Sequence, residues 1–408
     1  MLLKTFNIRH LRVFIEVVKY KSISRASEKV FLSQPAITQA IAKLEVILNT
    51  SLFDRRNDGM FVTKSGKVFA LRLQRAIDIL LSGLKDTIRF RGTKGSQPSY
   101  LLKMLTTTQL RALIAVSEAQ NFSIASRNLN VSQSSLHRAA HELESLLEVV
   151  LFEKTSTGIM LSKAASVLVK ASKLAFSEIA QGQDEIKSID DQEIGQIVIG
   201  SMPFARTSIL PDAIIKFSDQ FPYFKIKVND GPYDDLLNYL RQGDIDVLIG
   251  ALRFPVLAGD VIQKEIFTSP VEVVARTNHP LCRVDHVAIE ELKEYPWVMP
   301  KIGTPTRTVF ESVFNEKGIG TPQRLIETGS LILIRGLLLG SDRLTMISKH
   351  QIQHELDMNI LKLIPYKLDH PSRAIGVTVR RGWKPTATQI VFLNMLSAND
   401  GYIDIDEQ

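Results

Sequence analysis

The sequence predicts a multidomain α plus α/β protein. Two winged helix-turn-helix domains, each continued by a long linker helix, precede a two-lobed α/β domain. Three observations predict this fold. One segment occurs twice in the first half of the chain. Each copy combines apolar residues at helical spacing with one hairpin signal. From Gly195 onward, short apolar strands alternate with helices instead.

The positive charge is concentrated in the first quarter of the chain. The 408 residues carry a formal net charge of +7. Met1–Lys103 contains 19 Lys and Arg against 7 Asp and Glu, whereas Met104–Glu193 contains 8 against 11. The remainder contains 23 against 25. A localised basic field attracts phosphate through counterion release, so we expect a polyanionic partner for the first quarter.

The cysteine content and the apolar runs favour a cytoplasmic protein with no membrane partner. Cys282 is the single cysteine, which excludes an intramolecular disulfide and a cysteine-based zinc finger. The first residues carry Lys4, Arg9 and Arg12, so no signal peptide is predicted. No run approaches the roughly 18 uncharged apolar residues of a membrane span.

The duplication has a constant offset of 99 positions and no gap. The matched pairs are Leu11 and Leu110, Ala26 and Ala125, Ser33 and Ser132, Gln34 and Gln133, Glu45 and Glu144, Phe53 and Phe152, Gly59 and Gly158, and Lys64 and Lys163. A polar stretch from Arg89 to Pro98 separates the copies and is typical of a linker. The predicted division is 1–90, a linker at 91–103, 104–193, 194–398, and a tail at 399–408.

Each copy follows one plan, described here for the first. Leu11, Phe14, Ile15 and Val18 have helical spacing. Ser24 is the expected N-cap of a second helix over 25–30, and Ser33 is the expected N-cap of a third helix with Gln34-Pro35 in its first turn. Ile37, Ile41, Leu44 and Leu48 form the buried stripe of that helix. Two short strands around Asn57-Asp58-Gly59 form a wing. A long helix over 65–88 follows, with apolar residues at the spacing of a helix-helix seam.

The first copy resembles the winged helix-turn-helix of LysR-type transcriptional regulators. Ser33–Glu45, Leu52–Arg55 and Thr63–Gly66 carry the resemblance. It implies double-stranded DNA as a partner, and glutamine can bond adenine while a threonine methyl can touch thymine. The expected DNA-binding residues are Ser33, Gln34, Pro35, Thr38, Gln39, Lys43, Arg55 and Arg56. The alternative interpretation is a small helical packing unit that does not bind DNA.

Ordinary members of that family carry one DNA-reading winged helix-turn-helix domain, called the reader below. The second copy in this chain is a departure from that pattern. Ser134 replaces Pro35, Glu142 replaces Lys43, and Ala165 replaces Gly66. Glutamates on the third helix would repel phosphate, and only Arg138 and Lys154 remain near the expected face. We therefore expect the second copy to serve as a built-in partner for the first copy, and not as a second, equal DNA reader. His137 and His141 are four residues apart, but no third ligand lies nearby in sequence, so no metal site is predicted.

The C-terminal half predicts α/β units with a mainly parallel sheet. Expected strands are 196–200, 224–228, 246–250, 271–275, 344–347, 359–363 and 374–379, and expected helices are 209–217, 236–240, 331–339 and 386–396. This half resembles the effector domain of the same family, on Gly195–Ser201, Gly243–Asp246 and His279–Leu281. The resemblance implies a fold like a type 2 periplasmic binding protein, with a ligand held between two lobes.

The expected effector-binding residues lie after strands or before helices of the two lobes. They are Ser201, Met202, Phe204, Arg253, Thr304, Thr306, Thr328 and Ser330. Thr304 and Thr306 belong to an expected loop, Gly303–Thr306. The alternative for each hydroxyl is helix capping. The stretch Arg380–Thr386 resembles sugar-responsive members near the galactose-binding-protein regulators, so a sugar or an organic acid is the expected effector class.

These patterns together predict a sequence-specific DNA-binding transcriptional regulator that a small metabolite modulates. No nucleophile elbow, P-loop, dinucleotide fingerprint or metal triad occurs, so no catalytic residue, metal or cofactor is predicted and the protein is not expected to be an enzyme. The expected partners are DNA, a small-molecule effector and further copies of the chain, with RNA polymerase as a candidate. The alternative is a cytosolic solute sensor whose N-terminal part only dimerises.

Overall fold

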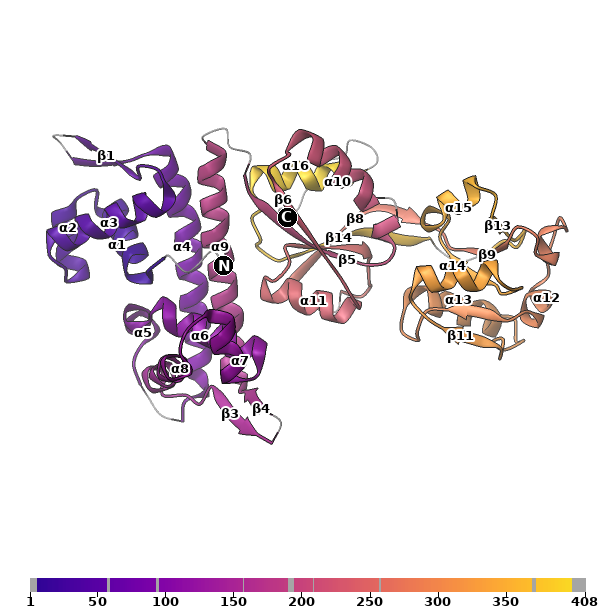
Figure 1. The fold of residues 1–408 in the computed structure, drawn as a ribbon, viewed down its shortest axis with the longest axis horizontal. Helices are drawn as coiled ribbons and strands as arrows, with labels where there is room; N and C mark the ends of the chain where they lie inside the picture. Colours follow the sequence, from indigo (N-terminus) through magenta and orange to yellow (C-terminus); the bar gives the residue numbers. More distant parts are fainter. Residues whose placement is uncertain are drawn as a thin grey trace. The chain divides into compact units, whose positions relative to one another are not determined.

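The structure, a computed structural model, describes residues 6–56, 59–92, 95–156, 158–189, 194–207, 209–256, 258–368 and 372–397 (Figure 1). The chain divides into two compact units. The first is Met1–Gly195 with Gln242–Asp244, and the second is Gln196–Arg241 with Ile245–Gln408. The finer division predicted from the sequence stays a prediction, and its tail at 399–408 lies outside the described residues.

The first unit contains the same order of elements twice. The first set is α1 (Ile8–Tyr20), α2 (Ile23–Val30), α3 (Gln34–Leu48), β1 (Phe53–Arg56), β2 (Gly59–Val62) and α4 (Lys64–Thr87). After α5 (Pro98–Met104), the second set is α6 (Thr107–Ala119), α7 (Phe122–Leu129), α8 (Gln133–Leu147), β3 (Phe152–Thr155), β4 (Gly158–Leu161) and α9 (Lys163–Ile189). Each strand pair is an antiparallel hairpin.

The offset of 99 is also present in the backbone conformation. Six left-handed residues close the corresponding helices as three pairs: Lys21 and Gln120, Phe31 and Asn130, and Asn49 and Glu148. A left-handed residue at this position lets the backbone leave the helix while its N–H still bonds a helix carbonyl. The two copies therefore share their local chain path as well as their residues.

Of the two N-caps predicted in the first copy, one is confirmed and the other is wrong. Ser33 caps α3 as predicted, since its hydroxyl accepts the Ala36 N–H at 3.4 Å. The predicted cap Ser24 is wrong, because Ser22 has the extended backbone and accepts the Arg25 N–H at 3.4 Å. Ser24 lies inside the first turn of α2. The predicted turn at Asn57-Asp58 lies outside the described residues.

The segment between the copies is less coil-like than the linker predicted at 91–103. Residues 98–104 form α5, with Pro98 in its first turn and Leu101 and Leu102 buried. Proline is well tolerated at the first helical position, and the two leucines gain from leaving water. The chain therefore docks here instead of running free, and residues 93–94 lie outside the described part.

The long helices α4 and α9 pack against each other along their length (Figure 1). Most of the residues predicted for this seam are buried: Phe69, Leu73, Ala76, Leu80 and Leu84 on α4, and Leu168, Ala171, Ala175, Ile179 and Ile186 on α9. Ile88, which was also predicted for the seam, follows α4 and is half-buried. Glycine permits close approach at two points, where Gly83 faces Ala171 and Gly182 faces Arg72. A shift of 99 relates these two contacts, so the helix pair has an approximate two-fold relation.

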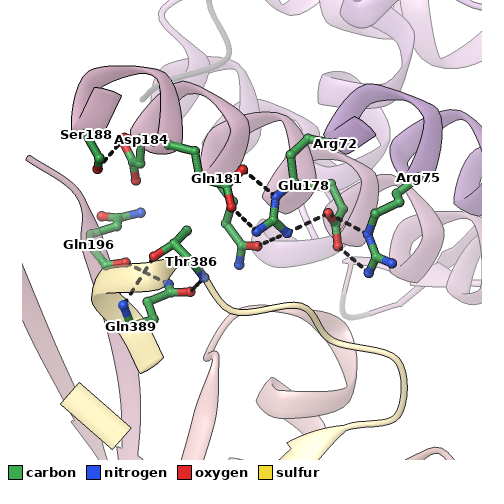
Figure 2. A network of polar contacts seen from close by, with 10 residues as sticks. Arg72, Arg75, Glu178, Gln181, Asp184, Ser188, Gln196, Thr386 and Gln389 are labelled. Carbon is green, nitrogen blue, oxygen red and sulfur yellow. Dashed lines mark hydrogen bonds and ion pairs between the residues drawn. The ribbon is translucent and has the colours of Figure 1, made fainter. Parts of the chain in front are cut away.

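The ion pairs of Arg72 depart from this two-fold relation between α4 and α9 (Figure 2). The buried Arg72 guanidinium lies 3.1 Å from Glu178 Oε2 and also donates to Gln181 and Glu185. Arg75 donates to the other Glu178 oxygen at 3.0 Å. Burial alone would lower the pKa of Arg72, but the hydrogen bonds and charges of Glu185 and Glu178 raise it. In the matched contact Ala171 takes the place of Arg72, so α4 and α9 are not interchangeable.

Gly83→Ala is expected to weaken the packing of α4 on α9. A Cβ at Gly83 would lie 2.2 Å from the Ala171 Cβ, and neither methyl group can rotate away. Overpacking of this kind costs about 1–3 kcal/mol. Amide hydrogen exchange in both helices should therefore accelerate. Ala171→Gly in the same chain should restore slow exchange, and failure of this rescue would show that the two positions do not meet.

The second unit consists of two lobes. The first lobe holds β5 (Gln196–Ser201), α10 (Ile209–Gln220), β6 (Lys225–Asp230), α11 (Tyr233–Gln242), β7 (Val247–Ala251), β8 (Val261–Ser269), β14 (Arg373–Arg380) and α16 (Ala387–Met395). The second lobe holds β9 (Glu272–Arg276), α12 (Ile289–Glu294), β10 (Trp297–Met299), α13 (Pro305–Glu316), β11 (Leu325–Glu327), α14 (Leu331–Leu339), β12 (Thr345–Ile347), α15 (Gln353–Asp357) and β13 (Leu361–Leu363).

The sheet of the first lobe has the order β6-β5-β7-β14-β8. Only β5, β6 and β7 are parallel, while β14 runs antiparallel to both β7 and β8. The second lobe has an antiparallel sheet, β12-β9-β13, and a parallel pair, β10-β11. The predicted mainly parallel sheet is therefore wrong, because β8 and β14 carry the chain between the lobes in opposite directions.

Each lobe has its own aromatic core. Phe217 packs edge-on against Phe392 in the first lobe, with ring centroids 5.2 Å apart. Trp297 packs on Phe310 in the second, at 5.0 Å, and its indole N–H donates to the Leu292 carbonyl. Burying large rings stabilises each lobe separately, so the residues that join the lobes need not form a core. Among the described residues, no helix is long and apolar enough to span a bilayer.

Candidate nucleic-acid interface and ligand site

The exposed start of α3 forms one candidate interface. Gln34, Pro35 and Gln39 are exposed, and they line a concave surface with Ile23, Ala36, Thr38 and Ala42. The Thr38 hydroxyl donates to the Gln34 carbonyl at 3.1 Å, so its methyl group is the part left for an outside contact. No acidic residue lies in the first turn, and the helix dipole there favours a negative ligand such as phosphate.

Glu45 fixes the wing relative to α3. Its Oε1 accepts the backbone N–H groups of Leu52 at 2.8 Å and Phe53 at 3.4 Å. Glu144 does the same for Leu151 and Phe152 in the second copy. In the sequence, this glutamate is distinguished only as part of the repeat. Its position at the helix end before the wing was the available signal.

The basic residues of the first copy divide between the helix and the wing. Lys43 is exposed on α3. Arg56 is exposed on β1, and its guanidinium lies 4.9 Å from the centre of the Phe61 ring. A cation–π contact at this distance can hold a surface guanidinium in place without neutralising it. Arg55 belongs to β1, but its side chain lies outside the described part of the structure.

The matching surface of the second copy is differently equipped. Gln133 accepts a hydrogen bond from the Ser123 hydroxyl at 3.1 Å. His137, at the position of Thr38, stacks on Phe122 with ring centroids 3.9 Å apart. Arg138 takes the place of Gln39, and the exposed Glu142 takes the place of Lys43. Gln133 and His137 are therefore engaged by neighbouring side chains, and Glu142 makes the charge of this surface less positive.

His137 and His141 make contacts that need no metal. His141 Nδ1 lies 3.1 Å from Glu144 Oε2, and burial lowers the pKa of His137, as does the nearby His141. Among the described residues, no group of three His, Cys, Asp or Glu side chains is placed to hold a metal ion. The stacked His137 therefore has a packing role in the surface of the second copy.

A second candidate site lies where β8 and β14 leave the sheet of the first lobe. Ser269 and Arg373 are direct cross-strand partners at this point. The Ser269 hydroxyl lies 2.5 Å from the Ser348 hydroxyl and 3.1 Å from His350 Nδ1 in the second lobe. Arg373 Nη1 donates to the Thr306 hydroxyl, also in the second lobe. Polar side chains from both lobes therefore meet at the strands that connect them.

Aromatic rings border these polar groups. The His350 ring centre lies 5.6 Å from that of Phe267 and 6.3 Å from that of Phe204. The Arg373 guanidinium lies 5.9 Å from the centre of the Phe204 ring. Burial, and then the charge of Lys349, lowers the pKa of His350. Burial also lowers the pKa of Arg373 to about 10. These groups could hold a small molecule that has both a polar and an apolar part.

Of the eight effector residues predicted from the sequence, two lie in this cluster: Phe204 and Thr306. Thr306 is in the first turn of α13, so the predicted Gly303–Thr306 loop is wrong from Pro305 onward. Pro305 occupies the first helical position, where its missing N–H costs nothing. Thr304 precedes the helix, and its hydroxyl donates to the Lys301 carbonyl at 2.9 Å.

The other five predicted residues make local contacts. Ser201 is fully buried at the end of β5 and followed by the half-buried Met202, and Arg253 lies 3.9 Å from the centre of the Tyr233 ring. Ser330 caps α14 by accepting the Leu333 N–H, and Thr328 accepts the Ser330 N–H. Capping accounts for both of these hydroxyls, and their ligand role stays a prediction.

Four residues of the cluster were missed by the sequence analysis: Ser269, Ser348, His350 and Arg373. They lie on separate strands and loops of the two lobes, and no motif joins them. Arg373 gave a weak signal, as a charged residue at the start of an otherwise apolar strand. The antiparallel pairing of β8 with β14, which the sequence analysis did not predict, is what places it beside Ser269.

Family models match both units of the chain. The LysR substrate binding domain matches residues 190–400. The bacterial regulatory helix-turn-helix protein of the lysR family matches twice, at residues 8–67 and 107–166. The first of these helix-turn-helix matches contains α3 and the wing, and the second contains α8 and its hairpin.

Two curated relatives differ in how much of this chain they match. HTH-type transcriptional regulator GalR of Pseudomonas putida is 31% identical over 376 residues, which are 92% of this chain and 93% of that protein. HTH-type transcriptional regulator PcaQ of Agrobacterium fabrum is 26% identical over 277 residues, 68% of this chain and 89% of that protein. The match to GalR covers nearly all of this chain, whereas the match to PcaQ covers about two thirds of it.

Solved structures share the fold at low identity. A full-length variant of OxyR from Pseudomonas aeruginosa has a TM-score of 0.55 and 20% identity, and the match covers 72% of this chain and 94% of that one. CbnR, a LysR family transcriptional regulator, has a TM-score of 0.50 and 17% identity, and the match covers 71% of this chain and 96% of that one.

Proposed function

The chain belongs to the LysR family of transcriptional regulators, and from that membership we propose that α3 of the first copy reads specific DNA sequences under the control of a small metabolite. The family resemblance predicted from the sequence is thereby confirmed. A DNA-binding helix-turn-helix part and a substrate-binding part are both present. Three points are proposals: that α3 of the first copy reads DNA, that the second copy pairs with the first, and that a metabolite binds the second unit.

The exposed start of α3 carries the DNA-binding proposal. Gln34 and Gln39 are exposed, and no acidic residue lies in the first turn of α3. Both belong to Met1–Lys103, the segment that carries the basic excess. Recognition helices of this type place their N-terminal residues on base edges in the major groove. Arg56 and Lys43 then supply phosphate contacts, which set affinity and salt dependence.

The second copy is proposed to be the partner of the first within one chain. Other LysR-type regulators join two chains through the helix after the wing, whereas α4 and α9 pair here inside one unit. Arg72 supports this arrangement, because two α4 helices paired in the same way would set it against Ile79 in place of the buried Glu178, and would leave it Asp86 in place of Glu185. Each chain then contributes one strong reader, and a two-fold DNA site requires two chains.

The effector is proposed to bind between the lobes of the second unit. Supporting this are the polar groups from both lobes that meet beside β8 and β14. A ligand shifts a conformational equilibrium only through different affinities for the two states. Groups contributed by both lobes meet this condition, since opening the lobes would separate them.

Selection from random DNA by the full chain tests the proposed function. Enrichment of one sequence, with a steep loss of binding as salt rises, is the expected result. Binding without any preferred sequence would instead indicate an architectural protein that binds DNA without sequence specificity. Absence of DNA binding would favour the alternative of a solute sensor with an N-terminal dimerisation part.

A further inference from the structure

On the basis of the proposed function, we propose that the effector is a small organic monocarboxylate and that Arg373 is the residue that binds its carboxylate. Neutral sugars and phosphate esters are thereby placed outside the effector class. Arg373 is a binding residue that the sequence analysis did not identify.

The charge of Arg373 is uncompensated among the residues that the structure describes. Its Nη1 donates to the neutral Thr306 hydroxyl, while Nε and Nη2 are buried without a hydrogen-bond partner there. The arginines that are buried as whole residues have carboxylates: Arg72 has Glu178, Arg307 has Glu311, and Arg380 has Asp246. Arg373 is half-buried, but its Nε and Nη2 are shielded from solvent without such a partner among the described residues. A buried charge without a counter-charge is unfavourable, so a bound anion would stabilise this site.

The geometry of the two N–H groups without a described partner favours a carboxylate. Nε and Nη2 present two parallel N–H groups, which match the two oxygens of one carboxylate in a bidentate pair. Thr306 already occupies the opposite side of the guanidinium. One positive charge balances a monocarboxylate, whereas a phosphate ester brings up to two negative charges. The N-terminus of α13, where Thr306 lies, adds a favourable dipole.

The surroundings of Arg373 suit an organic body attached to that carboxylate. Phe204 borders the guanidinium, and Phe267 and His350 lie next to Phe204. The hydroxyls of Ser269 and Ser348 are within the same group of contacts. The carboxylate would therefore lie against β14, with the rest of the molecule against the rings.

The ligand-free protein provides the first test. Both tryptophans, Trp297 and Trp383, lie in the second unit, so their fluorescence reports its melting alone. Arg373→Met keeps the volume and removes the uncompensated charge, so Tm should rise. Arg380→Met is the matched control: it removes the partner of the buried Asp246, so Tm should fall. A fall in Tm for Arg373→Met as well would show that its charge is already balanced, and would overturn the proposal.

Acetate, the simplest organic monocarboxylate probe, provides the second test. At equal ionic strength, sodium acetate should raise the Tm of the wild type above its value in sodium chloride. Arg373→Met should weaken this response at least about tenfold, a loss of roughly 1.4 kcal/mol. Arg276→Met, which removes an arginine paired with Asp342, should keep the response. The proposal is overturned if acetate acts no better than chloride, if phosphate acts better than acetate, or if Arg373→Met responds fully.

Matched pairs of larger probes then test the organic body. Benzoate against benzamide, and gluconate against glucose, differ in the carboxylate but little in size. Binding by the charged member of a pair, lost in Arg373→Met, supports the proposal, while equal binding of both members contradicts it. DNA selection with the same protein is independent of these results. A normal DNA preference with a failed acetate test rejects only the carboxylate site, whereas loss of DNA preference rejects the proposed function.

Discussion

Arg72→Ala is expected to separate α4 from α9 while the helices themselves remain. The substitution leaves Glu178 buried beside α4 and paired with the half-buried Arg75. Removing one partner of a buried ion pair costs about 3–5 kcal/mol, so opening of the helix pair should become at least roughly a hundredfold more frequent. Amide hydrogen exchange in α4 and α9 measures this change.

Two further variants show whether the buried charge is the cause. Lys85→Ala removes an exposed charge from the same helix and should change the free energy of opening by less than about 0.5 kcal/mol. Arg72→Met combined with Glu178→Met should regain most of the loss, because apolar residues of similar volume can replace a buried pair. A double variant as loose as Arg72→Ala would show that shape, and not charge, sets the pairing.

Gln39→Glu combined with Arg56→Glu is expected to weaken DNA binding about a hundredfold or more at physiological salt. The first change removes a base contact worth about 1–3 kcal/mol and adds a charge that repels phosphate. The second reverses a phosphate contact, so the salt dependence of the remaining binding should also become less steep. Fluorescence anisotropy with the selected DNA, at several salt concentrations, measures both effects.

The second copy offers the matched control for this experiment. Arg138→Glu combined with Lys154→Glu reverses two exposed basic residues on the corresponding surface. If the second copy acts as a partner, this variant should lose far less affinity than the first. Equal losses from the two double variants would show that both copies contact DNA, and the asymmetry would have to be abandoned.

Periodicity and capping rules were sufficient for much of the first unit. The Ser33 cap, the buried stripe of α3 and the seams of the long helices follow from local patterns, and the structure confirms them. Ser22 was missed because two serines separated by one residue fit the same capping rule, and only the backbone distinguishes them. Local rules therefore located the reader but not every helix start.

The second unit was harder to predict because its site depends on strand pairing. β8 carries Gln263, Lys264 and Glu265 in its centre, and at the sheet edge it pairs only with β14. Its sequence therefore lacks the apolar run of a buried strand. Without β8 there was no reason to place Ser269 opposite Arg373, and the cluster between the lobes could not be predicted.

The identity of the reader is tested most directly by comparing the DNA sequences that three proteins select from random DNA: the wild type, Gln39→Ala and Arg138→Ala. Positions 39 and 138 correspond in the two copies. Gln39→Ala should lose preference at one base position, by about 1–3 kcal/mol, while Arg138→Ala should select the same sequence as the wild type. A changed sequence for Arg138→Ala together with an unchanged one for Gln39→Ala would contradict the account.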